Sequence, residues 1–477
     1  MSEEQGITAK KEKNFSEWYT QIIQKAELAE YSQVSGCMIL RPYSYEIWEK
    51  VQAYFNEKIK KQGVKNAYFP LLIPESLFKK EKEHVKGFTP EVAWVTQAGD
   101  TKLNERLAIR PTSETIVYDT YKKWIRSYKD LPLKLNQWCN IIRWEFQHPA
   151  PFLRTREFLW QEGHTAFAKK QEAEEEALQI LNLYTKVYQD LYAIPVLQGK
   201  KSEKEKFAGA VYTLSIETML PNGKAIQCAT SHFLGQNFSK AFDISFLDEN
   251  NKNSYVYQNS WGLTTRSIGI MIAIHSDNKG LILPPKIAPI QVIIIPIIFE
   301  KNKEKILNKC KELKKSIKFS VEIDNNEDYT PGWKFNYWEL KGVPIRLELG
   351  PKDIEKKQVV LVRRDTNKKE TVKFINLNKK IELTLEDIQK SLLKKAQSFL
   401  KNSIKEVKNF EEFKKAIKDK KIVYAPWCSL IDCEENIKHK TEGAKSLTIP
   451  LKQEKVKGKC VNCNKEAQVY AYFGKAY

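Results

Sequence analysis

Several familiar nucleotide-binding signatures are missing from this sequence of 477 residues. It has neither a G-x-x-x-x-G-K-[ST] loop nor a G-x-G-x-x-G turn, so neither a P-loop nor a standard dinucleotide fold is indicated. It also shows no internal repeat and no long low-complexity segment. A nucleotide, if one is bound, would therefore be held by arginine side chains on an antiparallel sheet.

Long apolar stretches are also absent. The most apolar run, Ile287 to Phe299, is short and is interrupted by Pro289, Gln291 and Pro296, which predicts a buried strand rather than a membrane span. The first fifteen residues are charged and lack the apolar centre of a signal peptide. We therefore expect a cytoplasmic protein that has no membrane partner.

Cysteine is sparse, with eight residues in the chain. Without a secretion signal a disulfide framework is not expected, and clustered cysteines instead favour a metal site. Cys428 and Cys433 form a C-x4-C pair, and Cys460 and Cys463 form a C-x2-C pair. This spacing predicts a structural Zn²⁺ site, and four free thiols or a redox C-x-x-C pair are the alternatives.

What the chain does have is positive charge. Its formal net charge is +20 and its pI is about 9.3, with the excess spread along the sequence. Such a balance favours a polyanionic partner, most simply nucleic acid, although a coding bias toward lysine would give the same composition. The length suggests two to four domains, each able to bury a core.

The most informative stretch runs from residue 141 to residue 167. Strand residues two apart face the same way, so Arg143 and Glu145 share a face before a loop expected from Gln147 to Phe152. The return strand then places one polar and aromatic set on a single face: Arg154, Arg156, Phe158, Trp160, Glu162 and His164. This pattern predicts an anionic ligand, and a solvated sheet face with scattered ion pairs is the alternative.

Helices are expected over residues 14–35, from Pro42 to Gly63 and over residues 170–193. A strand over residues 64–73 carries Pro70, which suits an edge or a subunit contact. From residue 287 onward, alternating strands and helices predict a small α/β module.

Two further sites combine polar residues with helix starts. Thr112 and Ser113 suit the cap of a helix and Glu114 its first turn, so capping alone could explain all three. Arg266 heads an otherwise apolar helix and needs an anionic partner, either a structural carboxylate or a phosphate ligand.

These segments resemble the three signature motifs of class II aminoacyl-tRNA synthetases. In finer detail the chain is similar to the prolyl-tRNA synthetases of the archaeal/eukaryotic-like type, through RPTSE at 110–114, FLRTREFLWQEGHT at 152–165 and SWGLTTRSIG at 260–269. The resemblance covers the chain from about residue 14 to its last residue.

The resemblance implies roles for the site residues. The catalytic arginines would be Arg143, Arg154 and Arg266. L-proline would be bound by Thr112, Glu114, Arg143, Trp160, Glu162, His164 and His232. ATP would be bound by Arg143, Glu145, Arg154, Thr155, Phe158, Gln227, Thr230, Thr264 and Arg266. Mg²⁺ would accompany ATP, Zn²⁺ would be held by Cys428, Cys433, Cys460 and Cys463, and Tyr477 would lie near the active site.

The resemblance also implies the architecture and partners. We expect an α+β catalytic domain on an antiparallel sheet over residues 1–285, an α/β anticodon-binding domain over 286–380, and a C-terminal zinc-binding α+β domain over 381–477. The partners would be tRNA(Pro) and a second copy in a homodimer. Between Arg154 and Arg266 there is no room for the editing insertion of bacterial-type relatives. Alternatives are a threonyl, glycyl or histidyl class II enzyme and a non-catalytic tRNA-binding paralogue.

Overall fold

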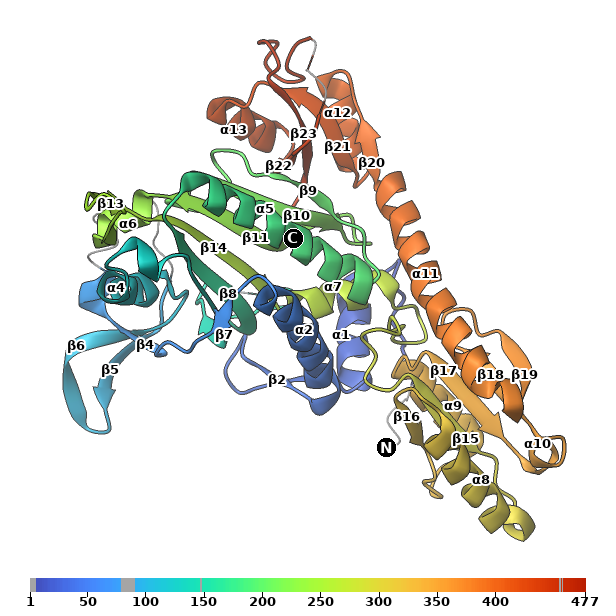
Figure 1. Ribbon diagram of the computed structural model, residues 1–477. Helices are drawn as coiled ribbons and strands as arrows, with labels where there is room; N and C mark the ends of the chain where they lie inside the picture. Colours follow the sequence, from blue (N-terminus) through green and yellow to red (C-terminus); the bar gives the residue numbers. More distant parts are fainter. Residues whose placement is uncertain (1–5, 79–90, 146–147, 454–455, 457) are drawn as a thin grey trace.

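The structure is a computed structural model that describes residues 6–78, 91–145, 148–453, 456 and 458–477. A central sheet lies between an α/β module at one end and a C-terminal module at the other, and one long helix runs along the side and joins the two modules (Figure 1). No helix in these described ranges combines the length and apolar character needed to cross a membrane.

The central sheet carries the candidate site. Its order is β20-β21-β23-β22-β9-β10-β11-β14-β8-β7-β3, and the pairs from β9 to β7 are all antiparallel, as the sequence predicts. The strands of its catalytic part are β3 (Lys65–Asn66), β7 (Leu133–Ile142), β8 (Glu157–Phe167), β9 (Leu197–Lys200), β10 (Tyr212–Met219), β11 (Ala225–Gly235) and β14 (Tyr257–Thr264).

The β7–β8 hairpin is shorter than expected. Its register runs from Leu133 opposite Ala166 to Ile142 opposite Glu157, so the predicted strand residues Arg143 and Arg156 lie just beyond the strand ends. The turn contains two prolines and Phe152 at φ +59°, a combination that cannot continue a ladder. Its expected first residue, Gln147, lies outside the described residues.

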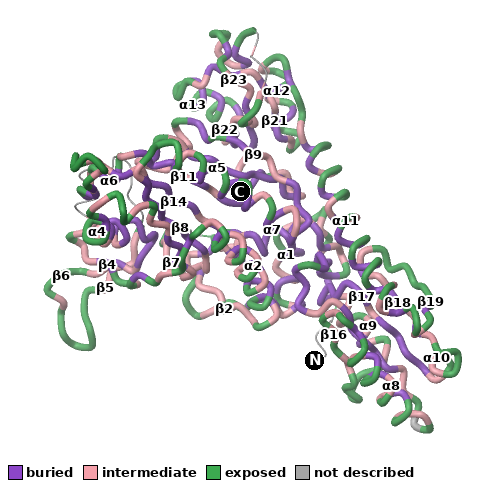
Figure 2. The backbone as a smooth tube through the Cα atoms, viewed as in Figure 1, coloured by how far each residue is buried: buried purple, intermediate pink, exposed green. Residues whose placement is uncertain are grey.

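Helices cover the face of the sheet opposite the site. α5 packs across β8, β10, β11 and β14, and its continuation η2 forms a π-helical turn. The buried backbone of these layers is visible in Figure 2, which also shows the exposed β5–β6 hairpin. The bounds are α1 (Phe15–Lys25), α2 (Pro42–Lys60), α4 (Glu114–Trp124), η1 (Tyr128–Asp130), α5 (Lys170–Lys186), η2 (Val187–Leu191), α6 (Asn237–Phe242) and α7 (Arg266–His275).

Two sequence-based expectations near the start are wrong in extent. The helix predicted over residues 14–35 ends at Lys25, because Glu27 adopts φ +58° and the chain then forms a short hairpin. The strand predicted over 64–73 is divided by the exposed segment around Pro70. The small strands of this part are β1 (Ala29–Tyr31), β2 (Met38–Leu40), β4 (Leu72–Pro74), β5 (Trp94–Ala98), β6 (Thr101–Ile109), β12 (Ser245–Leu247) and β13 (Asn253–Tyr255).

The α/β module contains a five-stranded sheet of order β16-β15-β17-β18-β19. Its Val292–Pro296 strand is buried at every position, which explains why the sequence there is an unbroken apolar run. The other bounds are β16 (Val321–Ile323), β17 (Ile345–Leu349), β18 (Gln358–Arg363), β19 (Lys369–Lys373), η3 (Glu300–Asn302), α8 (Lys303–Ser316), α9 (Pro331–Leu340), α10 (Pro351–Glu355) and η4 (Phe374–Asn376); β15 is the buried strand.

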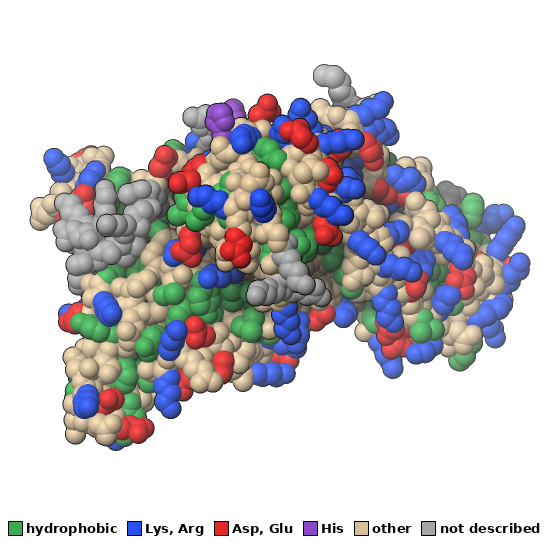
Figure 3. Space-filling model, turned by 90° about the horizontal axis from the view of Figure 1, so that it is seen from above, with side chains coloured by type: hydrophobic (Ala, Val, Ile, Leu, Met, Phe, Trp, Pro, Cys, Tyr) green, Lys and Arg blue, Asp and Glu red, His purple; other side chains and the backbone are tan. Residues whose placement is uncertain are grey.

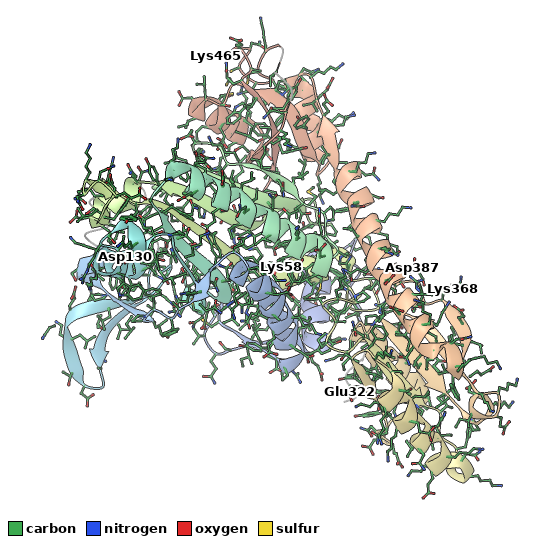
Figure 4. The ribbon with its side chains drawn as sticks, viewed as in Figure 1. Lys58, Asp130, Glu322, Lys368, Asp387 and Lys465 are labelled. Carbon is green, nitrogen blue, oxygen red and sulfur yellow. The ribbon has the colours of Figure 1, made fainter. Side chains whose placement is uncertain are left out.

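The long helix α11 (Leu377–Ser403) links this module to the C-terminal one. Asp387 on α11 lies beside the β18–β19 turn that carries Lys368 (Figure 4), and Arg363 donates to Asp387. Side chains of Lys and Arg are scattered over the face in Figure 3 rather than gathered in one patch. The positive charge is therefore distributed, as the sequence indicates.

The C-terminal module contributes strands to the central sheet. β22 pairs with β9 through Ile449 opposite Lys200 and Pro450 opposite Gly199. The strands of the two modules therefore form a single sheet that contains eleven strands. A Cβ on Gly199 would lie 2.1 Å from Thr448 Oγ1, so only glycine permits this approach. The bounds are β20 (Ile404–Glu406), α12 (Phe410–Lys418), β21 (Ile422–Trp427), α13 (Ile431–Lys440), β22 (Ala444–Pro450) and β23 (Val469–Lys475).

Candidate active site

A cavity of about 450 Å³ opens on the face of the central sheet that α5 does not cover. It brings together nearly all of the residues predicted from the sequence to bind proline or ATP. Those that line it are Thr112, Glu114, Arg143, Glu145, Thr155, Phe158, Trp160, Glu162, His164, Gln227, Thr230, His232, Thr264 and Arg266. Arg154 alone of the predicted set is not among the lining residues that the structure describes.

The alternation of β8 explains how one strand supplies four of these side chains. Phe158, Trp160, Glu162 and His164 all line the cavity, as the strand parity predicts. The intervening residues face the helices: Thr165 Oγ1 donates to Glu176 Oε2 of α5 at 2.5 Å.

Glu162 lies at the centre of a buried hydrogen-bond network. Its carboxylate accepts from Ser113 Oγ at 2.5 Å and from Gln137 Nε2 at 2.9 Å, and its Oε2 lies 3.1 Å from His164 Nε2. Burial opposes ionisation of Glu162, but the partners outweigh it and its pKa is lowered. Burial likewise opposes charge on His164, yet Glu162 and Glu114 raise its pKa. The two side chains therefore lie within ion-pairing distance inside the cavity wall, and each raises or lowers the pKa of the other toward the charged form.

The helix-capping interpretation of residues 112–114 is confirmed in position, since Ser113 precedes α4 and Glu114 lies in its first turn, but it does not account for the side-chain contacts. Ser113 occupies the N-cap position of α4 but makes no capping hydrogen bond with its hydroxyl, which instead donates to Glu162. Thr112 Oγ1 donates to the Glu114 carboxylate, and both residues are buried and line the cavity. This arrangement leaves a buried, oriented carboxylate beside the Glu162–His164 pair.

Arg143 crosses the cavity between the acidic groups and the aromatic rings. Its Nε donates to the Pro111 carbonyl at 2.9 Å, and its guanidinium lies 5.8 Å from the Phe158 ring centre and 5.7 Å from that of Trp160. Burial lowers the pKa of Arg143, although the group stays charged at neutral pH. The cavity therefore contains a fixed cation that can bind an anionic ligand.

Arg266 enters from the first residue of α7, as expected. Its Nε donates to the Leu153 carbonyl at 3.0 Å, and its backbone N–H donates to Thr264 Oγ1 at 3.1 Å. No carboxylate within salt-bridge distance of Arg266 is found in the described ranges, which favours the ligand interpretation over a structural salt bridge.

The far wall combines His232, which was predicted from the sequence, with two residues that the sequence analysis missed. His232 lies between Thr213 Oγ1 at 2.9 Å and Thr230 Oγ1 at 3.0 Å, and burial lowers its pKa to about 3, so it is neutral at pH 7. Glu205 and Phe207 also line the cavity, from the lysine-rich loop after β9. The only signal of their role in the sequence is an aromatic residue within a charged loop.

Two arginines of the hairpin do not line the cavity. Arg154 is exposed and pairs through its backbone with Ala150, at the base of the turn. Arg156 donates to the Ser35 carbonyl at 3.0 Å and lies 4.4 Å from the ring centre of Trp144, so it fixes the β1–β2 loop against the hairpin. Tyr477 is held by its N–H to the Ala225 carbonyl at 2.8 Å, and Arg154 and Arg266 oppose the burial that raises its pKa.

The four predicted metal ligands of the C-terminal module meet in space. Cys428, Cys433, Cys460 and Cys463 have sulfur atoms all within 4.8 Å of one another, with pairs at 3.5 and 3.6 Å. Tetrahedral Zn²⁺ with bonds of about 2.3 Å needs sulfur atoms about 3.8 Å apart. The hydrogen bond with Cys433 and nearby backbone N–H groups lower the pKa of Cys460 to about 4. The donor set therefore fits a zinc ion.

Comparison with known proteins divides the chain into the same succession of parts. Residues 94–275 match the tRNA synthetase class II core domain (G, H, P, S and T), residues 291–383 an anticodon binding domain, and residues 410–477 the C-terminal domain of prolyl-tRNA synthetase.

Similar sequences occur in bacteria and, within longer proteins, in animals. The chain is 53% identical to proline–tRNA ligase 2 of Bacillus thuringiensis, over 99% of both chains. It is 50% identical to the bifunctional glutamate/proline–tRNA ligase of Mus musculus and 49% identical to that of Drosophila melanogaster. There it covers 33% and 29% of the relative, so the chain spans about a third of the length of these bifunctional proteins.

Proposed function

The chain belongs to the class II prolyl-tRNA synthetases, and from this premise we propose that it activates L-proline with ATP and transfers the prolyl group to the 3′ end of tRNA(Pro). The observation that carries the proposal is the cavity, which combines two buried carboxylates with two arginines and aromatic walls. The chain is a proline–tRNA ligase. The proposal is restricted to this activity and does not include the glutamate–tRNA ligase activity named for the animal relatives.

The chemistry of activation fits a site that is rich in arginine. The carboxylate of the amino acid attacks the α-phosphate of ATP, pyrophosphate leaves, and prolyl-adenylate forms. The nucleophile is already ionised at pH 7, so the reaction requires no general base, only alignment and stabilisation of charge at phosphorus. Arg143 provides that charge, bridging the proline carboxylate and the α-phosphate. The neutral His232 is in keeping with a site without acid–base chemistry.

Proline carries a secondary ammonium and a compact ring. We assign its ammonium to Thr112 and Glu114, because this carboxylate is buried and oriented by its neighbour. Trp160 supplies a flat apolar wall. The remaining pocket residues are Glu162, His164 and His232.

ATP occupies the rest of the cavity in this proposal. Phe158 and Arg266 hold the two faces of the adenine, and Glu145 holds its edge. Arg154 reaches the outer phosphates from the rim of the turn, which requires its exposed side chain to swing inward. Thr155, in the turn before β8, and Thr264, the last residue of β14, contact the nucleotide in this proposal.

Two metal ions belong to the proposal. Mg²⁺ would be held near Gln227 and Thr230, whose oxygen atoms line the cavity on β11, and it would neutralise phosphate charge. Zn²⁺ would be held by the four-cysteine cluster and would stabilise the fold of the C-terminal module.

Transfer requires tRNA and, we propose, a dimer. The module over residues 286–380 would bind the anticodon, and the net charge of +20 favours contacts with phosphates. Tyr68 and Leu72, on either side of the exposed Pro70, are 72% and 39% exposed and would pack against a second copy. Light scattering should then give twice the chain mass of 55.6 kDa.

The proposal also covers the bounds of the three parts and the cellular location. We propose that the catalytic part ends near residue 285 and the zinc-binding part begins near residue 381. Between β8 and β14 the chain forms α5, η2, strands β9 to β11 of the catalytic sheet, α6 and the two-stranded β12–β13 sheet. These elements leave no room for the editing insertion of bacterial-type relatives. None of the eight cysteines, all of which lie in the described residues, forms a disulfide, which is in keeping with a cytoplasmic location.

The test is ATP–pyrophosphate exchange with each of the twenty amino acids. Proline should give the highest kcat/KM, and alanine should give measurable exchange because the loss of ring methylenes is worth only about 1–3 kcal/mol each. Higher exchange with threonine, glycine or histidine would identify another class II enzyme. Absence of exchange with every amino acid, together with binding of tRNA(Pro), would identify a non-catalytic paralogue.

A further inference from the structure

One wall of the cavity is a loop with no helix or strand of its own. Residues 201–211 connect β9 to β10, and Glu205, Phe207 and Ala208 within this loop line the cavity. Internal hydrogen bonds close its tip into a compact turn, from Glu205 N–H to Ser202 Oγ at 3.2 Å and from Lys206 N–H to the Ser202 carbonyl at 3.0 Å. The position of this turn sets the shape of the cavity.

The loop acts on the cavity through Phe207. The Phe207 ring centre lies 4.6 Å from that of His232, and its backbone N–H donates to Thr213 Oγ1 at 2.9 Å. Thr213 Oγ1 in turn lies 2.9 Å from His232 Nδ1. A shift of the loop would therefore move His232, a residue of the proposed proline pocket.

The loop is held from outside by the C-terminal module. Glu205 forms an ion pair with Lys445 of β22, and Lys204 forms one with Glu435 of α13. At the base of the loop, Lys201 Nζ donates to Glu217 Oε1 at 2.5 Å and to the Leu447 carbonyl at 2.8 Å. Contacts from Lys201, Lys204 and Glu205 thus connect the cavity wall to a module that begins some 200 residues later in the sequence.

The two charged partners are themselves fixed by separate elements. Lys445 lies in a strand that pairs with β23 on one side and, through its last residues, with β9 on the other. Glu435 lies on α13, which is joined to that strand by the buried Glu434, whose carboxylate accepts from Ser446 Oγ at 2.5 Å. The module therefore presents both charges to the loop from a rigid support.

We propose that Lys445 and Glu435 are positioning residues for the amino-acid pocket. They hold the 201–211 loop so that Phe207 fixes His232, and the C-terminal module thereby sets the affinity for proline. Neither residue touches substrate, since neither lines the cavity. The inference rests on the proposed function of the cavity and adds a role for the C-terminal module beyond its proposed zinc site.

The test removes both ion pairs at once, in the variant Lys445→Met/Glu435→Gln. Each pair is partly exposed, so losing one is worth a factor of about 2 to 5, and losing both should raise the KM for proline about 5- to 20-fold. The kcat of exchange and the KM for ATP should stay near their wild-type values. The matched control Lys414→Met/Glu411→Gln removes a surface pair within the same module and should leave all three constants unchanged.

A charge exchange provides the second arm. Glu435→Lys alone should raise the KM for proline by repelling Lys204, and adding Lys204→Glu should restore it. An unchanged KM for proline in the first double variant, equal changes in the KM for ATP and in kcat, or failure of the exchange to restore would each overturn the proposal. Wild-type protein that shows no proline-dependent exchange would instead overturn the proposed function, so the two failures are distinct.

Discussion

The substitution Glu114→Gln tests the proposed proline pocket most directly. It removes one negative charge from a side chain that is 4% exposed and keeps its size and its ability to accept from Thr112. If Glu114 binds the proline ammonium, the ligand loses its principal counter-charge while the surrounding hydrogen bonds remain.

The magnitude follows from the burial of the pair. Two unit charges about 3 Å apart at an effective dielectric constant of about 20 attract by about 5 kcal/mol. A neutral amide retains a hydrogen bond worth about 1 kcal/mol, and the charge on nearby His164 and Arg143 weakens the binding of a cation further. The loss of about 3–4 kcal/mol corresponds to a 10²- to 10³-fold decrease in kcat/KM for proline, at about 1.4 kcal/mol per factor of ten.

The assay is ATP–pyrophosphate exchange at varied proline, supported by calorimetric measurement of proline binding. The KM for ATP should stay within a factor of about two, because uniform loss of both affinities indicates a misfolded site. Glu176→Gln is the matched control: Glu176 is buried, its pKa is raised by burial, and it accepts from Thr165 and Asn259 on the opposite face of the sheet. A decrease of less than tenfold for Glu114→Gln, or an equal decrease for Glu176→Gln, would refute the assignment.

Three further predictions concern zinc, the joined sheet and pH. Metal analysis of the wild type should give about one zinc per chain, and zinc-free protein would disprove the site. The variant Cys460→Ser should release the zinc. The control Cys310→Ser, which removes a buried thiol in α8, should retain it. The substitution Gly199→Ala should lower the free energy of unfolding by about 1–3 kcal/mol, because its Cβ would lie 2.1 Å from Thr448 Oγ1. The control Gly332→Ala places a Cβ with no atom within 4 Å and should leave thermal unfolding unchanged. The pKa of His164 is raised in the folded protein, so the stability that it contributes is fully present below about pH 6.5 and is lost as pH rises through the folded pKa. The pKa of Glu162 is lowered, so the stability that it contributes is present above about pH 4.5 and is lost as pH falls through the folded pKa. Thermal unfolding of His164→Gln should therefore depend less on pH above 6.5 than that of the wild type, and parallel curves would contradict the pair.

Local periodicity was enough to predict the side of β8 that faces the cavity. Phe158, Trp160, Glu162 and His164 are predictable because a regular strand fixes the direction of alternate side chains. The same parity fails for Arg154 and Arg156, because the strand begins only at Glu157 and the turn before it rotates the chain. The cysteine spacing was equally informative, since two short pairs of ligands need only one long-range contact to meet.

Contacts between distant segments could not be predicted from the sequence. Nothing in the pattern around Lys200 indicates that it pairs with Ile449, and nothing around Lys445 indicates that it reaches Glu205. The cost of closing such loops is met by burial of the whole interface rather than by a local preference. Glu205 and Phe207 were missed for this reason, since their loop is irregular and acquires a role only when the two modules meet.

The joined sheet also affects how the protein can be divided for study. β9 would be an edge strand of the catalytic sheet if the C-terminal module were removed, and its backbone at Gly199 and Lys200 would lose its pairing with β22. Exposed edges of this kind pair with other chains and promote aggregation. A fragment that stops before residue 404 would therefore expose an aggregation-prone edge strand. In the whole chain the C-terminal module covers this edge of the catalytic sheet.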